Sequence, residues 1–242
     1  MDKISEFKQM GKKNTEKGNM KNFFNEQELK RISDAITKAE KRTSGEIAVA
    51  FIKQSDSYAI YELFAALIVG LIYLNIMLIN YQPVNEFISS KYWVFSHQIT
   101  AAFIGLSSFI VVAIVYLLMN IPFVDRLIVP KKIMKKKAED RAYLHFIKAG
   151  LTETRDRTGI LIFISYLERR VIIIGDMGIN KKIKQEKWGE FIEIIIAGIK
   201  NNRLADSLVS VIKQCGHILE EHFPIKPDDT NELSNDVIFL ER

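Results

Sequence analysis

Two long stretches without a charged residue constrain this chain more than any other feature. The first is LFAALIVGLIYLNIMLI, from Leu63 to Ile79, and it extends back to Ala59 if Glu62 is included. The second is ITAAFIGLSSFIVVAIVYLLMNIPFV, from Ile99 to Val124. A helix needs about 20 apolar residues to cross the hydrocarbon core of a bilayer, and neither stretch has a polar face. We therefore predict a transmembrane hairpin over residues 59–124, with spans at about 59–80 and 99–122.

The basic residues around the two stretches predict how the hairpin is oriented. Lys91 is the only Lys or Arg in the connecting loop. On the other side of the predicted membrane lie Lys38, Lys41, Arg42, Lys53, Arg126, Lys131, Lys132, Lys135, Lys136 and Lys137. Cytoplasmic loops carry the excess of Lys and Arg. We expect a two-span protein of the cell inner membrane with both termini cytoplasmic, and the first span begins too far along the chain to be a signal peptide.

A basic run follows the second span and predicts contact with lipid. It consists of Lys131, Lys132, Lys135, Lys136 and Lys137. Each such residue close to a membrane surface gains about 1 kcal/mol from anionic headgroups. The bilayer and its headgroups are thus the expected partners, together with another membrane protein. Nucleic acid is not expected, because no aromatic residues are interleaved for base stacking, and Tyr143 and Phe146 are interpreted as the buried face of this helix.

Charged flanks on both sides of the hairpin predict one soluble domain that the hairpin interrupts. Before the spans, Asn25 and Glu28 form a capping-box pattern at the start of a helix, and Glu46 to Lys53 reads as a strand. One helix and one strand cannot bury a core alone. Their partners are expected after the hairpin: a helix from Lys131 to Ala149 that ends at Gly150, two strands joined around Glu168 and Arg169, two amphipathic helices, and a strand from Val237 to Leu240.

This pattern predicts an α/β/α sandwich, with helices over the faces of a sheet. We expect residues 1–22 to form a basic, flexible N-terminal segment, 23–58 the first part of the sandwich, and 125–242 the second part with an acidic C-terminal tail. The single cysteine, Cys215, excludes an intrachain disulfide, and its place in an apolar run predicts a buried structural thiol.

The stretch VIIIGDMGIN, from Val171 to Asn180, raises the question of a nucleotide site. A dinucleotide fingerprint would read G-x-G-x-x-G and a P-loop G-x-x-x-x-G-K-[ST]. Only G-D-M-G is present, and the preceding strand belongs to a hairpin. We predict a strand that ends in a tight glycine bend, with Asp176 as the residue there that could do chemistry.

Four segments in this order resemble the TPM domain family, most closely its bacterial membrane branch, in which a transmembrane hairpin interrupts the domain. They are SGEIAVAFI, TRDRTGILIFISYLERRVIIIGDMGIN, RLADSLVSVIKQCGHILEEHFP and PDDTNELSND. The likeness covers Phe24 to Leu240 apart from the spans. It implies an α/β/α sandwich and, for some relatives, acid phosphatase activity with divalent metals held by aspartates.

The family's acidic positions are only partly present in this chain. Phe23, Phe24 and Asn25 stand where many members place an aspartate before the first helix, and Arg157 stands where many place one before the middle strand, with Asp156 one position further back. Asp176 matches the loop after the hairpin. The candidate metal ligands, for calcium or magnesium, are Asp176, Asp156, Asp228, Asp229 and Glu232, with Asp236 beside them.

Three functions remain open from the sequence. The first is a binding or assembly module held at the cytoplasmic membrane surface. The second is a metal-dependent, phosphatase-like hydrolase that uses the candidate carboxylates. The third is a structural membrane organiser. Convergence of three or more carboxylates in one cleft would favour the hydrolase over the binding module.

Overall fold

The computed structural model describes residues 23–91, 97–119, 121–226 and 232–241. The N-terminal segment predicted over 1–22 lies outside these residues. Two compact units are distinguished: one consists of Ser57–Ile133, and the other of the chain up to Asp56 together with the chain from Met134 onward. We call the first the hairpin unit and the second the sheet unit.

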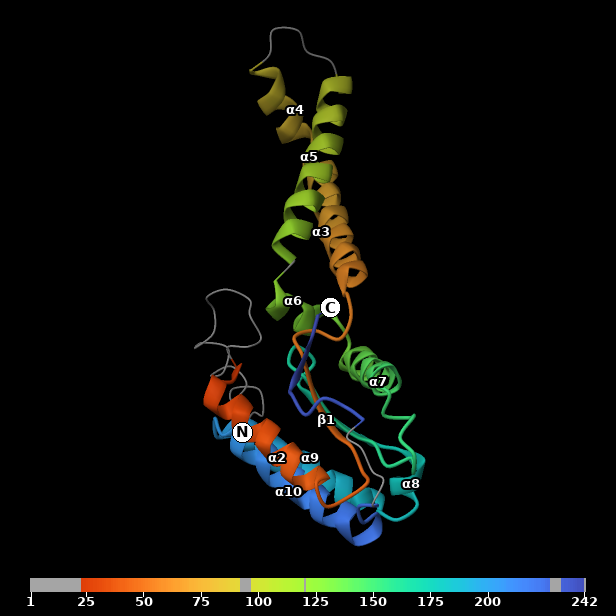
Figure 1. Cartoon of the computed structure of the whole chain (residues 1–242). Helices are drawn as coiled ribbons and strands as arrows, with labels where there is room; N and C mark the ends of the chain where they lie inside the picture. Colours follow the sequence, from red (N-terminus) through yellow and green to blue (C-terminus); the bar gives the residue numbers. More distant parts are fainter. Residues whose placement is uncertain (1–22, 92–96, 120, 227–231, 242) are drawn as a thin grey trace. The chain divides into compact units, whose positions relative to one another are not determined.

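A four-stranded sheet forms the centre of the sheet unit (Figure 1). Its strands are β1 (Ile47–Ile52), β2 (Ile160–Ser165), β3 (Arg170–Gly175) and β4 (Ile238–Leu240). They lie in the order β3-β2-β1-β4; β1 is parallel to β2 and β4, and β3 is antiparallel to β2. Every residue of β1 and β2 is buried. Both faces of these strands are covered, which explains why their sequences are apolar throughout and do not alternate.

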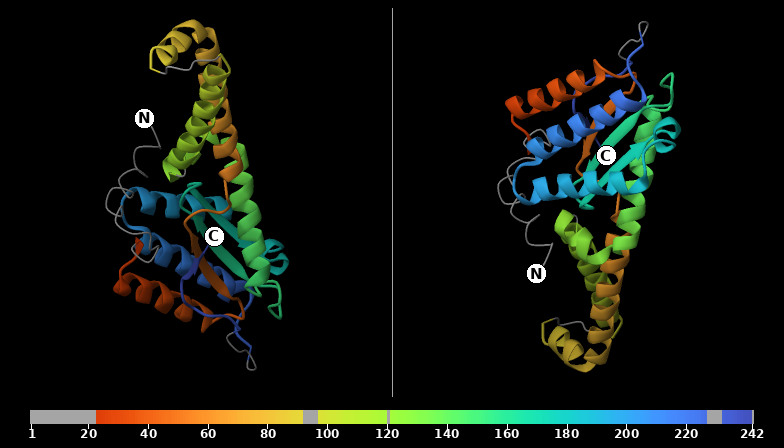
Figure 2. Two further views of the ribbon diagram at one scale, coloured as in Figure 1. Left: turned by 90° about the horizontal axis from the view of Figure 1, so that it is seen from above. Right: turned by 90° about the horizontal axis from the view of Figure 1, so that it is seen from below.

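Helices cover both faces of the sheet, as Figure 2 shows. They are α2 (Glu26–Glu40), α9 (Gln185–Lys200) and α10 (Leu204–His222) on one face and α7 (Lys131–Lys148) on the other. The parallel connection from β1 to β2 runs through α7, and the hairpin unit is inserted ahead of that helix. The predicted α/β/α sandwich, interrupted by a pair of apolar helices, is confirmed.

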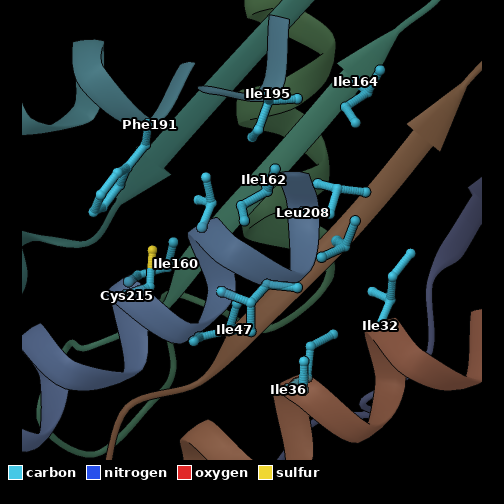
Figure 3. Close-up of a cluster of buried hydrophobic side chains, with 14 of the residues drawn as sticks. Ile32, Ile36, Ile47, Ile160, Ile162, Ile164, Phe191, Ile195, Leu208 and Cys215 are labelled. Atoms are coloured by element: carbon cyan, nitrogen blue, oxygen red, sulfur yellow. The ribbon is translucent and has the colours of Figure 1, made fainter. Parts of the chain in front are cut away.

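Alternate residues of each central strand point to opposite faces of the sheet. Ile47, Val49 and Phe51 face the three-helix layer, whereas Ala48 and Ala50 face α7. The larger core is made of aliphatic side chains from α2, α9 and α10 that meet β1 and β2 (Figure 3). Burying one such side chain stabilises the fold by about 1.5–3 kcal/mol. The smaller core under α7 contains two strand alanines, Ala48 and Ala50, with Ala142 and Phe146 of the helix.

Local signals define the ends of two helices as predicted. At the start of α2, the side chain of Asn25 accepts from the Glu28 amide at 2.8 Å, and the Asn25 amide donates to the Glu28 carboxylate at 2.8 Å. Gly150 follows α7 with φ of 76°, a left-handed conformation that favours glycine. The interpretation of Tyr143 as a buried residue is wrong, because its side chain is 59% exposed; Phe146 is 3% exposed and does face the core.

The chain after β3 differs from the tight glycine bend that the sequence predicted. Asp176 begins a short helix, α8 (Met177–Asn180), and Gly175 and Gly178 do not adopt positive φ. Gly178 is needed for another reason: a Cβ there would lie 2.5 Å from the carbonyl oxygen of Asp156 and 2.6 Å from that of Arg157. The close approach of two backbone segments, and not the turn, requires glycine.

The hairpin unit consists of α3 (Ala59–Ile79), α4 (Tyr81–Ser89), α5 (His97–Met119) and α6 (Pro122–Ile128). Within the described residues, α3 and α5 are long and apolar enough to cross a membrane. Two details differ from the prediction: α4 occupies part of the predicted loop, and α5 ends before Pro122, which starts a new helix because proline cannot continue the previous one.

Small side chains bring α3 and α5 together. Ala66 is fully buried, and a Cβ on Gly70 would overlap Val112 on the facing helix. The Ser108 hydroxyl donates to the carbonyl oxygen of Ile104 at 2.7 Å, so its donor is satisfied within α5. Close backbone approach through small residues is typical of helix pairs in membranes. The outward faces of both helices carry exposed large apolar side chains.

Candidate functional site

Two candidate carboxylates lie at the same end of the sheet. Ile160 pairs with Ile47 on one side and with Gly175 on the other, so β1 and β2 begin where β3 ends. Asp156 precedes β2 and Asp176 directly follows β3. The backbone joins these segments, since the amide of Asp176 donates to the carbonyl oxygen of Gly159 at 2.9 Å.

Asp176 is buried and acts as a helix cap. Its side chain is 6% exposed, and Oδ1 accepts from the Met177 amide at 2.7 Å. Oδ2 lies 3.8 Å from Nη1 of Arg157 and has no hydrogen-bond partner among the described residues. Arg157 has φ of 56°, a strained conformation for a residue with a long side chain. The arginine therefore stands beside the carboxylate at a distance that leaves one oxygen without a hydrogen bond.

Asp156 forms a tight ion pair with a lysine on the chain that follows α10. Nζ of Lys226 lies 2.8 Å from Oδ1 and 2.6 Å from Oδ2, and the Ser44 hydroxyl donates to Oδ2 at 3.2 Å. The hydrogen bond from Lys226 is the main reason why the pKa of Asp156 is lowered. Its charge is thus balanced by a side chain of the same domain.

Glu232 and Asp236, the remaining candidate ligands that the structure describes, do not join this pair. The backbone amide of Glu232 donates to Oε1 of Glu46 at 3.0 Å, while its side chain is exposed. Asp236 accepts a long hydrogen bond of 3.4 Å from Ser33 on α2. Asp228 and Asp229 lie outside the described residues. Within the described ranges, no group of three His, Cys, Asp or Glu side chains is placed to hold a metal ion.

A partly buried carboxylate that the sequence analysis missed, Glu40, lies at the C-terminal end of α2. Oε1 of Glu40 accepts from the Ile47 amide at 2.9 Å and so ties the helix to the start of β1. Burial raises the pKa of Glu40 to about 8, and the nearby charge of Glu46 acts in the same direction. The helical spacing could have indicated that Glu40 faces the core, because Glu40 follows the buried Ile36 by one turn of the helix.

A second polar cluster lies at the opposite end of the central strands. The Ser165 hydroxyl donates to Oε2 of Glu168, whose Oε1 accepts from the Ser55 amide at 2.9 Å, and the Ser55 and Ser165 hydroxyls lie 2.8 Å apart. All three residues are buried. These groups satisfy one another and hold the β2–β3 turn against the end of β1, which is a structural role.

A basic groove lies between α2 and α10, and the sequence analysis did not identify it. The cavity has a volume of about 150 Å³ and is lined by Ala35, Lys38, Ala39, Arg42, Lys213 and His217. Gly216 lets the helices approach, since a Cβ there would lie 2.6 Å from Cβ of Ala39. The lining thus combines two alanines with two lysines, an arginine and a histidine. Lys38 and Arg42 are four residues apart, as are Lys213 and His217. This spacing places each pair on one face of a helix, but the sequence analysis used Lys38 and Arg42 only to predict the orientation of the hairpin.

The basic run at the start of α7 is exposed as a lysine-rich surface. Lys131, Lys132, Lys135, Lys136 and Lys137 all have exposed side chains. Two of them form ion pairs: Lys135 lies 3.6 Å from Glu139, and Lys137 lies 2.5 Å from Asp56.

The buried Cys215 matches the structural thiol that the sequence predicted. It is 1% exposed, and burial raises the pKa of its thiol to about 12. A thiolate is the nucleophilic form of cysteine, so this thiol stays protonated and out of reach of solvent in the folded domain at neutral pH.

These features define a class: an α/β/α sandwich domain whose first crossover carries an inserted pair of apolar helices. The family model described as the TPM domain matches residues 124–218. The chain thus contains a TPM domain, which confirms the resemblance seen in the sequence.

The fold is also similar to that in the NMR structure of the BA42 protein from the psychrophilic bacterium Bizionia argentinensis. The TM-score is 0.54 at 22% sequence identity, over 91% of this chain and 98% of that chain. At this identity the likeness concerns the fold alone. No curated protein sequence matches the chain.

Proposed function

We propose that this chain is a two-span inner-membrane protein whose cytoplasmic TPM domain binds an acidic segment of another membrane protein. The basic groove between α2 and α10 carries the proposal. It combines two alanine side chains with four basic side chains, which complements a segment that has carboxylates beside a small apolar side chain. Complementary charge of this kind gives specificity and speeds association.

Two of the basic groups already interact with an acid of the same domain, and two are more available. Arg42 and His217 lie 3.3 Å and 3.8 Å from Oε2 of Glu220. Lys38 and Lys213 are exposed, and within the described residues no carboxylate is recorded within ion-pair distance of either. A carboxylate from a partner would therefore meet these two lysines first.

The binding function is tested with the full chain in lipid nanodiscs and a fluorescent peptide of alternating Glu and Leu. We expect anisotropy to show saturable binding that the double variant Lys38→Glu/Lys213→Glu weakens at least tenfold, about 1.4 kcal/mol. Lys181→Glu/Lys182→Glu is the matched control, since it changes the net charge equally on an exposed loop whose lysines do not line the groove. Equal weakening in both variants, or no binding of the peptide, would contradict the proposal.

A phosphatase-like hydrolase remains the second candidate because of one observation. Oδ2 of the buried Asp176 has no hydrogen-bond partner among the described residues, which is costly unless a cation or donor approaches it. Against this, Arg157 and Lys226 already bring positive charge to the two aspartates at this end of the sheet.

Calorimetric titration of calcium, magnesium and manganese distinguishes the two candidates. Micromolar binding in the wild type that is lost in Asp176→Asn would favour the hydrolase and justify a phosphatase assay. Absence of binding with an intact peptide response would favour the binding module. Failure of both assays would leave the structural membrane organiser.

A further inference from the structure

The outward face of α7 carries an apolar cluster of a kind not seen elsewhere on the described surface of the sheet unit. Tyr143, Leu144 and Ile147 are 59%, 42% and 44% exposed. The other large apolar side chains exposed on this unit, Met177 and Ile225, are separate from this helix. A contiguous exposed apolar patch usually marks a surface that another apolar phase covers.

Two lysines of the basic run, Lys132 and Lys136, lie on the same side of the helix as the apolar cluster. At 3.6 residues per turn, Lys132, Lys136, Tyr143 and Ile147 fall within an arc of about 60°. The buried side chains of the helix, Met134, Ala138, Ala142 and Phe146, lie on the other side and face the sheet. The exposed face is thus basic in its first half and apolar and aromatic in its second half.

The acids near the basic run are Glu139, Asp140 and Asp56, and two of them are paired with its lysines. Glu139 lies 3.6 Å from Nζ of Lys135, and Asp140 is exposed in the middle of the face. Asp56 lies 2.5 Å from Nζ of Lys137. Five lysines of the basic run stand against these three acids, so the first half of the helix has a net positive surface. That sign fits anionic lipid headgroups and disfavours a basic surface on a second copy of this chain.

We propose that α7 lies along the cytoplasmic surface of the bilayer, with Tyr143, Leu144 and Ile147 at the headgroup and acyl boundary and its lysines on anionic headgroups. The proposal rests on the membrane location given under the proposed function. Interfacial helices bind lipid through this combination of basic and apolar side chains, and tyrosine has an apolar body with a polar tip that suits the boundary.

The position of α7 in the chain supports this occupant. The helix begins at Lys131, shortly after α5 ends at Met119, so its first turn cannot lie far from the end of the predicted span. An 18-residue helix is about 27 Å long. Lysines at one end and Tyr143 towards the other can both reach the interface only if the helix lies nearly parallel to the membrane.

The test places an environment-sensitive nitrobenzoxadiazole label on single cysteines in the full chain, reconstituted in nanodiscs with nitroxide-labelled lipids. Ile147→Cys reports on α7, and Leu71→Cys, which is 59% exposed on α3, reports on the span. The native Cys215 is buried with a raised thiol pKa and stays unlabelled. We expect lipid quenching at both positions, with at least twofold stronger quenching at position 147 when phosphatidylglycerol replaces part of the phosphatidylcholine.

The two positions separate failure of this inference from failure of the membrane location. Quenching at 71 without quenching at 147 overturns the α7 proposal and leaves the anchor intact. Lack of quenching at 71 overturns the membrane location itself. The label at position 147 could instead show a blue-shifted emission only when each nanodisc holds two chains, and without quenching by nitroxide lipid. That result would overturn the proposal and assign the face to a second copy of the chain.

Charge variants test the part played by the lysines. Lys132→Gln/Lys136→Gln should reduce quenching at position 147 in anionic nanodiscs to the level seen in phosphatidylcholine alone. The control Lys181→Gln/Lys182→Gln, on an exposed loop, should leave it unchanged. The same effect of both pairs would show a general charge effect and contradict a specific face on α7.

Discussion

Replacing Glu40 by Gln should stabilise the sheet unit at alkaline pH and remove part of its pH dependence. Glu40 joins the end of α2 to the start of β1 through the Ile47 amide, 2.9 Å from Oε1. Glutamine keeps the carbonyl oxygen that accepts this hydrogen bond, but it cannot ionise. The substitution therefore isolates the cost of placing a charge at this site.

The magnitude follows from the shift in the pKa of Glu40 from 4.5 to about 8, caused first by burial and also by the charge of Glu46. The folded-state pKa is the higher one, so the folded state binds the proton more tightly. The contribution of Glu40 to the free energy of unfolding is therefore fully present below pH 4.5 and is lost as the pH rises to about 8. At 1.36 kcal/mol per pKa unit the ceiling is about 5 kcal/mol. Since the side chain is partly exposed, we expect about 2–3 kcal/mol.

The assay is urea unfolding of the full chain in detergent at pH 5 and pH 8.5, followed by the fluorescence of the buried Trp188 in a Trp93→Phe background. Glu40→Gln should match the wild type at pH 5 and exceed its free energy of unfolding at pH 8.5. Asp34→Asn, an exposed position on the same helix, is the control. An unchanged pH slope in Glu40→Gln would refute the reasoning.

Further predictions concern glycines and the cysteine. Gly178→Ala should lower the free energy of unfolding by about 2 kcal/mol or more, because the new Cβ would contact two carbonyl oxygens, whereas Gly189→Ala, with no atom within 4 Å of its Cβ, should raise it by up to about 1 kcal/mol; urea unfolding that ranks them the other way would contradict this. Gly70→Leu should weaken α3–α5 packing in a detergent titration, and Gly105→Leu, with open space around it, should not; equal effects would contradict the packing described. Cys215 should stay unmodified by maleimide at pH 8.5 until the chain unfolds, because its thiol is buried with a pKa of about 12; rapid labelling of the folded chain would show that the site opens.

The sequence was sufficient for features that depend on local pattern. The central strands and the two long apolar helices follow from uninterrupted apolar runs, and the capping box at Asn25 follows from two side chains three residues apart. Tyr143 was misplaced because the buried stripe of α7 advances by four residues from Met134 to Phe146. Tyr143 lies outside that stripe, although its apolar character alone suggested burial.

The candidate site could be predicted only in part, because its charges are balanced by residues far away in the chain. The tight pair between Asp156 and Lys226 joins residues 70 positions apart in the chain, and the contact from the Glu232 amide to Glu46 joins residues 186 positions apart. No spacing within one segment indicates them. Asp176 was identified as a chemically interesting residue, and its capping of α8 depends on a helix too short to show periodicity.

The most direct test of the account is the side of the membrane on which each segment lies. Ser90→Cys, near the end of α4, and Lys181→Cys, on an exposed loop of the sheet unit, are treated with a membrane-impermeant maleimide in intact spheroplasts and after lysis. The account predicts that position 90 is labelled in intact spheroplasts and position 181 only after lysis. Labelling of position 181 in intact spheroplasts, or of both positions only after lysis, would contradict a cytoplasmic TPM domain on a transmembrane hairpin.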